Sequence, residues 1–160
     1  LDQVRTLAKS MAQAKSVLFL GRNVGFPVAM EGALKLKELA YIHAEGFAAG
    51  ELKHGPIALI EEGQPVIVIV PSHTDSLHPK VISNIQEIRA RGAKVIAIAE
   101  AGDKAVAEFA EHVVYVPECE NIFSAILTVI PLQVFAMELS TAKGLDVDQP
   151  RNLAKSVTVE

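Results

Sequence analysis

The stretch VLFLGRNVGFP, residues 17–27, indicates how the chain folds. Its first four residues are apolar and are typical of a buried strand, which Gly21 ends. A turn follows, and Pro27 suits the first turn of a helix. A helix start after a strand can bind an anion, but two glycines four residues apart do not form GxGxxG, so we interpret the segment as a plain turn. The stretch predicts one strand–turn–helix unit of an α/β fold.

The same alternation continues on both sides of this unit. Apolar runs and helical periodicity predict further strands at residues 43–47, 65–70, 94–98 and 112–116, and helices or helical turns at 2–14, 48–54, 80–91, 103–110 and 121–143. Asn121 is expected to cap the last helix, Pro131 to kink or split it, and Gly144 to end it. The predicted fold is a three-layer α/β/α sandwich with a five-stranded parallel sheet. Ligands of such folds bind beyond the carboxyl ends of strands, here after Leu20, Phe47 and Val70.

Composition limits the classes of function. The chain of 160 residues is half apolar and 21% charged, which is typical of one soluble globular domain. A net charge of −4 argues against a nucleic-acid partner. We expect no apolar run long enough to cross a membrane. The single cysteine, Cys119, cannot form an internal disulfide, which fits a reducing cytoplasm.

Two further expectations come from single features of the chain. It opens at Leu1 rather than Met, so we expect it to be a piece of a longer protein. His73 and His78 lie in a turn-forming segment without a carboxylate or cysteine in register, so we expect exposed loop histidines. No metal and no cofactor are predicted.

Charged residues gather in EGALKLKELAYIHAEGFAAGELKHGP, residues 31–56. Glu31, Lys35 and Glu38 are spaced to share one face of a helix, and His54 ends the stretch. Carboxylate, ammonium and imidazole together indicate acid–base chemistry; the alternative is an ordinary solvated helix face. The neighbouring arc is expected to pack into the core and comprises Leu34, Leu36, Leu39, Ala40 and Ile42. By composition, the last sixteen residues, LDVDQPRNLAKSVTVE, form a frayed tail in which Arg151 and Lys155 are solvated.

Two segments, ELAYIHAEGFAAGELKHGPIALI (38–60) and DQPRNLAKSVTVE (148–160), resemble the sugar isomerase half of the glutamine–fructose-6-phosphate aminotransferase family. The resemblance covers essentially the whole chain and implies the second, C-terminal phosphosugar isomerase (SIS) subdomain at residues 1–144, with a flavodoxin-like fold, followed by a catalytic tail at 145–160. The family makes glucosamine 6-phosphate from fructose 6-phosphate and glutamine, the first step toward UDP-N-acetylglucosamine. The resemblance implies a cytoplasmic homodimer whose partners are the first SIS subdomain and an ammonia-releasing glutaminase domain.

The resemblance also implies roles for single residues. Glu38 matches the carboxylate that moves a proton between adjacent carbons, and Lys35 matches a lysine near the reacting hydroxyls. His54 matches the histidine that assists sugar-ring opening in the neighbouring subunit's site. Lys155 matches the tail lysine that contacts the open-chain sugar and forms a Schiff base, and Ala154 offers a backbone contact. Roles for Glu31, Glu45, Glu51 and Lys53 stay open.

Family features that this chain lacks limit what it does alone. The family's Ser/Thr-rich phosphate loop belongs to the first subdomain, and residues 71–76, PSHTDS, approach it only in composition. There is no N-terminal cysteine for glutamine hydrolysis. We therefore expect the isolated chain to be inactive. The alternatives are a non-catalytic, phosphosugar-binding regulatory SIS module, which would need neither base, histidine nor tail lysine, and a dimerisation half that pairs through the 121–143 helix.

Overall fold

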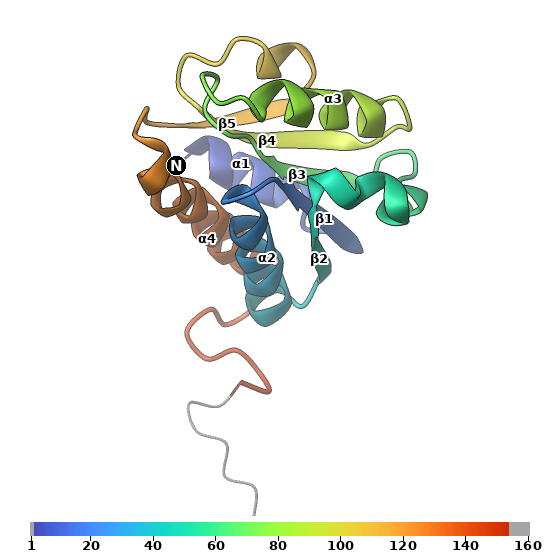
Figure 1. The fold of residues 1–160 in the computed structure, drawn as a ribbon. Helices are drawn as coiled ribbons and strands as arrows, with labels where there is room; N and C mark the ends of the chain where they lie inside the picture. The colour runs from blue at the N-terminus through green and yellow to red at the C-terminus, as the bar shows by residue number, and fades with distance from the viewer. Residues whose placement is uncertain (1, 154–160) are drawn as a thin grey trace, which may run out of the picture.

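A single parallel sheet lies at the centre of the computed structural model, which describes residues 2–153 (Figure 1). Its strands are β1 (Ser16–Gly21), β2 (His43–Ala48), β3 (Pro65–Ile69), β4 (Lys94–Glu100) and β5 (His112–Val116). They are arranged in the order β2-β1-β3-β4-β5, and all four pairings are parallel. The predicted five-stranded parallel sheet is confirmed.

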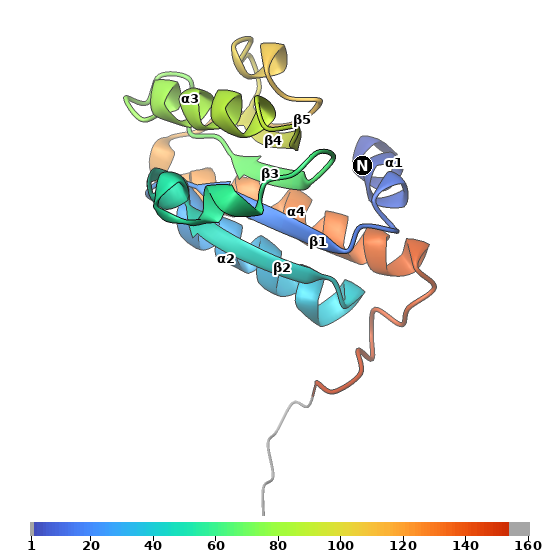
Figure 2. The same cartoon turned by 90° about the vertical axis from the view of Figure 1, so that its right-hand side faces the viewer.

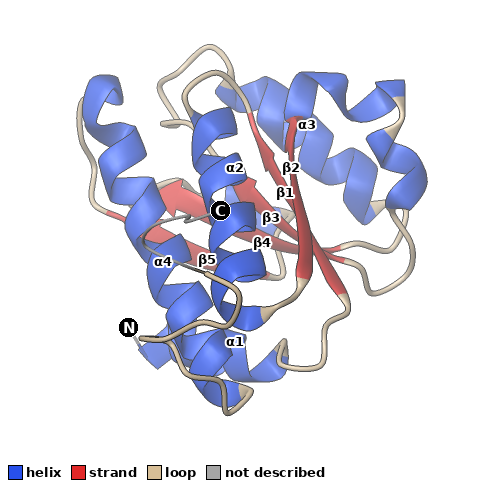
Figure 3. Ribbon diagram, turned by 90° about the horizontal axis from the view of Figure 1, so that it is seen from below, coloured by secondary structure: helices blue, strands red, loops and turns tan. Residues whose placement is uncertain are grey.

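Helices cover both faces of this sheet. On one face lie α1 (Asp2–Ser10), α2 (Gly25–Lys35) and α4 (Ser124–Ala142), side by side in Figure 3. On the other lies α3 (His78–Arg89), with the 3₁₀ helices η2 (Ala49–His54) and η3 (Pro56–Leu59) beside it. Both faces carry an apolar core, which is why the central strands are continuous apolar runs rather than alternating ones. The predicted three-layer sandwich is confirmed.

The strand order reverses beside β1, which pairs with β2 on one side and β3 on the other. α2 connects β1 to β2, so it begins at the carboxyl edge of the sheet and ends at the amino edge (Figure 2). α2 lies unusually close to β2, because a Cβ atom at Gly46 would be 2.8 Å from the Cα of Met30. This contact sets how closely the middle of α2 approaches β2.

The helix predictions were only partly correct. Residues 103–110 form just one short 3₁₀ turn, η4 (Val106–Glu108). Asn121 does not cap α4, because it lies in the separate 3₁₀ turn η5 (Asn121–Phe123) that precedes the helix; its side-chain amide donates to Asp75 Oδ2. α4 passes through Pro131 without a break, so the predicted split is wrong. The stop at Gly144 is confirmed by its φ of 71° and by the Leu145 N–H, which donates to the Ser140 carbonyl.

The last helix also corrects the expectation about membrane spans. An 18-residue window within Asn121–Ala142 has a mean hydropathy of 1.9, and by length and composition this helix could cross a membrane. Only 28% of its apolar window is buried within this chain, although its inner face packs on the sheet as a core helix does. A helix that is apolar on every side is expected to be buried on every side, and for this helix the remaining burial would come from a surface outside this domain.

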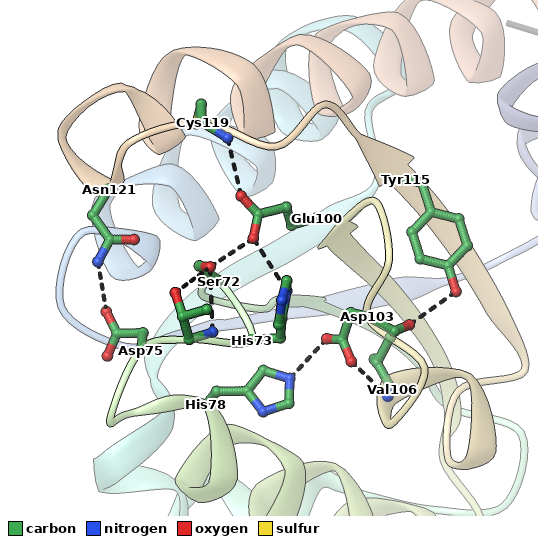
Figure 4. A network of polar contacts seen from close by, with 11 residues as sticks. Ser72, His73, Asp75, His78, Glu100, Asp103, Val106, Tyr115, Cys119 and Asn121 are labelled. Carbon is green, nitrogen blue, oxygen red and sulfur yellow. Dashed lines mark hydrogen bonds and ion pairs between the residues drawn. The ribbon is translucent and has the colours of Figure 1, made fainter.

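The two histidines after β3 differ from each other (Figure 4). His73 is exposed, as predicted, and lies 3.4 Å from Glu100 Oε2. His78 is buried, so that prediction is wrong: it begins α3, and its Nε2 is 2.7 Å from Asp103 Oδ2. The side chain of Asp103 also accepts the Val106 N–H. A buried imidazole needs such a partner, and the partner lies 25 residues away in the sequence.

Candidate active site

Three charged side chains meet at the end of α2. The Lys35 ammonium donates a hydrogen bond to the Glu38 carboxylate and lies 3.6 Å from Glu31 Oε1. The Lys35 and Glu38 side chains are 26% and 27% exposed, so both remain accessible to a small molecule. The predicted clustering of these three residues is confirmed. A carboxylate in contact with a lysine can accept and return a proton while the lysine stabilises nearby negative charge.

The Glu38 turn is a π-helix rather than the α-helix expected from the spacing. This element, η1 (Leu36–Ala40), ends at Tyr41, whose φ is 53°. A π-turn disturbs the regular backbone pairing, and π-turns occur often at functional sites. Here the Leu39 carbonyl accepts a hydrogen bond from the buried Ser140 hydroxyl of α4, at 2.9 Å. Leu36, Ala40 and Ile42 are buried as predicted, whereas Leu34 is 40% exposed.

The charges around Lys35 alter its proton affinity. The hydrogen bond to Glu38 raises the pKa of Lys35 above its ordinary value of 10.5; partial burial opposes the rise, and the charges of Glu31 and Glu38 add to it. Lys35 therefore remains a cation throughout the neutral range. A fixed positive charge beside a carboxylate suits the stabilisation of an oxyanion that develops during proton transfer.

An open hollow of about 490 Å³ lies between Glu38 and Tyr41 on one side and the tail residues 151–153 on the other. The Arg151 N–H donates to the Tyr41 hydroxyl at 2.7 Å, and the Arg151 guanidinium lies 4.2 Å from the centre of the Tyr41 ring. Arg151 is exposed, as predicted, but these two contacts attach it to the body of the domain, so the interpretation of this part of the tail as frayed is wrong. Ala154 and Lys155 lie outside the described residues. Sequence reasoning missed Tyr41, since neither its spacing nor its type distinguishes it.

His54 does not join this group. Its Nδ1 is 2.6 Å from Glu51 Oε2, and its side chain is 72% exposed. In Figure 2, η1 lies at one end of β2 and η2 at the other. Since β2 has six residues, its ends are separated by about 20 Å at roughly 3.3 Å per residue. Only the His54 end of the 31–56 stretch reaches the carboxyl edge of the sheet, where ligand binding was expected.

A second cavity, of about 240 Å³, lies at that carboxyl edge, where the strand order reverses. It is lined by the turn after β1, including Arg22 and Asn23, and by the segment after β3, including Asp75. Two of the three predicted loops, those after Leu20 and Val70, therefore form a cavity, and the plain-turn interpretation overlooked it.

The hydroxyl-rich loop beside this second cavity is already bonded within the protein (Figure 4). Ser72 donates to Glu100 Oε2 at 2.6 Å, and its hydroxyl is 3.0 Å from that of Thr74. The Cys119 N–H donates to Glu100 Oε1. The negative charge of a carboxylate at this position repels a phosphate, which agrees with the expectation that residues 71–76 are not a phosphate loop. Within residues 2–153, no three His, Cys, Asp or Glu side chains are placed to hold a metal ion.

Comparison with known proteins gives consistent matches. The SIS domain family matches residues 10–143. Proteins named glutamine–fructose-6-phosphate aminotransferase (isomerizing) from Leifsonia xyli and Corynebacterium diphtheriae are 72% and 70% identical to the chain. Each match covers 99% of this chain but 26% of the relative, so the chain spans about a quarter of their length. The C-terminal domain of glucosamine-fructose-6-phosphate aminotransferase from Francisella tularensis has a TM-score of 0.83 and 38% identity, over 92% of this chain and 41% of that one.

Proposed function

The chain belongs to the SIS domain family, and on that basis we propose that it is the second isomerase subdomain of a glutamine–fructose-6-phosphate aminotransferase. In this proposal, residues 1–144 form the subdomain and residues 145–160 the catalytic tail. The complete enzyme takes ammonia from glutamine and converts fructose 6-phosphate to glucosamine 6-phosphate. It works in the cytoplasm, where a lone thiol such as Cys119 stays reduced.

The observation that carries this proposal is the contact between Lys35 and Glu38, because Glu38 lines a hollow whose other side is formed by the tail residues 151–153. Glu38 takes a proton from one carbon of the open-chain sugar imine and returns it to the adjacent carbon, which converts ketose to aldose. Lys35 stabilises the negative charge that develops on the sugar oxygen between these two transfers. In the proposal Lys155 forms the Schiff base with the open-chain sugar and Ala154 offers a backbone contact; both lie outside the described residues.

The separation of His54 from Glu38 supports a homodimer. About 20 Å of strand lies between them, so one imidazole cannot serve the carboxylate of its own chain within hydrogen-bond reach. In the proposal His54 opens the sugar ring in the partner subunit's site. The exposed position of His54 and its contact with Glu51 leave the ring available at the surface.

The outer surface of the helical layer supports a further partner, the first SIS subdomain of the complete chain. Large apolar side chains on α2, α4 and η5 are at least 40% exposed; they are Met30, Leu34, Ile122, Phe123, Ile126, Ile130 and Met137. Exposed apolar surface of this kind marks interaction sites. This chain covers 41% of the matching Francisella domain, which leaves room there for a second unit of similar size.

Glu38→Gln in the complete enzyme tests the proposal. Glucosamine 6-phosphate formation is expected to fall by at least about 100-fold, the usual contribution of a general base. Glutamine hydrolysis should persist, because it belongs to another domain. The matched control is Glu31→Gln, which removes the other carboxylate beside Lys35 and should change turnover only a few-fold. Undiminished synthesis in Glu38→Gln would refute the proposal and favour the regulatory module.

A further inference from the structure

Tyr41 is held in an unusual backbone conformation. Its φ of 53° lies in the left-handed region, which bulky residues seldom adopt. Its N–H nevertheless bonds the Leu36 carbonyl, so the strained residue ends the π-turn that carries Glu38. A strained residue next to a functional side chain persists when the surrounding contacts require it. This conformation places the phenol ring of Tyr41 at the hollow.

That phenol makes two separate contacts with the same tail residue. The hydroxyl accepts the main-chain N–H of Arg151 at 2.7 Å, a bond that any residue except proline could donate. The ring face lies 4.2 Å from the guanidinium carbon, a cation–π contact that needs the arginine. The two partners are 110 residues apart in the sequence. We call this pair of contacts the tail anchor.

We propose that Tyr41 is a positioning residue that fastens the C-terminal tail over the Glu38 hollow and so sets the reach of Lys155. This inference rests on the proposed function. Lys155 follows Arg151 by four residues, and an extended chain spans at most about 3.5 Å per residue, so its Cα cannot lie more than about 14 Å from that of Arg151, which the anchor holds beside Tyr41. Glu38 and Arg151 line the same hollow. The anchor therefore holds the tail residues 151–153 beside the base, at the point from which the remaining tail starts.

The tail is also shaped before it reaches the anchor. The Asp146 side chain accepts the N–H groups of Asp148 at 2.9 Å and Gln149 at 3.0 Å, which forms a local turn after the α4 stop. This turn redirects the chain back toward Tyr41. Tyr41 is thus the point at which the returning segment attaches to the body of the domain.

The test uses the complete enzyme with a graded series of substitutions. Tyr41→Phe keeps the ring and removes the hydroxyl, and Tyr41→Leu removes both contacts. The control is Tyr115→Phe, because Tyr115 is the only other tyrosine and its hydroxyl donates to the Asp103 carbonyl, away from the tail. Thermal unfolding of each variant checks that the fold survives.

The first readout is tryptic cleavage of the bond after Arg151, followed by mass spectrometry. Cleavage tracks the population of the undocked tail, so Tyr41→Phe should speed it about fivefold and Tyr41→Leu about twentyfold, while Tyr115→Phe matches the parent. The second readout is kcat for glucosamine 6-phosphate formation, which should fall in the same order. Borohydride trapping of sugar on Lys155 should fall with it, and glutamine hydrolysis should not change.

Each outcome separates the tail anchor from the proposed function. Cleavage at the parental rate in both Tyr41 variants would refute the anchor. Faster cleavage with undiminished turnover, in an enzyme that Glu38→Gln inactivates, would refute the positioning role. If Glu38→Gln also retained full turnover, the proposed function would fail, and faster cleavage would still support the anchor.

Discussion

Ser140→Ala should destabilise the domain through the π-turn, although Ser140 lies on a different helix. The Ser140 side chain is fully buried, and its hydroxyl donates to the Leu39 carbonyl at 2.9 Å. Alanine removes a hydrogen bond worth about 1 kcal/mol and leaves that carbonyl unpaired, for a total loss of about 2 kcal/mol. With a urea m-value near 2 kcal/mol/M, the unfolding midpoint should fall by about 1 M.

Thr141→Ala is the matched control for this experiment. Thr141 follows Ser140 on α4, but it is exposed, and its hydroxyl bonds the Met137 carbonyl of its own helix. Its loss should change the free energy of unfolding by no more than about 0.5 kcal/mol. Equal midpoint shifts in the two variants, or no shift in Ser140→Ala, would show that the π-turn does not depend on this contact.

Two other predictions concern the helical layer. Gly46→Ala should lower the free energy of unfolding in urea by about 1–3 kcal/mol, because its Cβ would be 2.8 Å from the Met30 backbone. The control is Gly50→Ala, whose Cβ would have no contact closer than 3.4 Å and which should lower the free energy of unfolding by less. Equal losses in the two variants would contradict this. Glu138→Gln should destabilise the chain at neutral pH but not in acid. Hydrogen bonding from Arg5 lowers the pKa of Glu138 below its ordinary 4.5, so its contribution is present above that value and is lost as the pH falls through the lowered pKa. A difference between parent and variant midpoints that is the same from pH 7 to pH 3 would refute the linkage.

The fold could be predicted from the sequence because its signals are local. Each strand of a doubly covered parallel sheet is buried on both faces, so a run such as PVIVI (65–69) is recognisable without knowledge of its neighbours. The failures lie where a distant partner decides the outcome. Asn121 is of a residue type that caps helices, but it lies in a separate 3₁₀ turn, where its amide donates to Asp75, 46 residues away. The local sequence around His78 predicts an exposed loop residue, but His78 is buried because Asp103, 25 residues away, pairs with its ring.

The candidate site was predictable in part for the same reason. The spacing of Glu31, Lys35 and Glu38 correctly indicated one charged cluster. The π-turn was not foreseeable, since Ser140 of another helix pairs its carbonyl. Tyr41 carries no signal of its own, because its partner lies 110 residues away.

The contact between the first and last helices has a consequence for synthesis. Arg5 Nη2 of α1 is 3.0 Å from Glu138 Oε1 of α4, and the two residues are 133 positions apart. At about 10 residues per second, α1 leaves the ribosome more than about ten seconds before its partner exists. Until then the apolar face of α1, with Val4 and Leu7, has no helix to cover it. Contacts so distant in sequence form slowly, so α1 packs against α4 only in a late step, after α4 has been made.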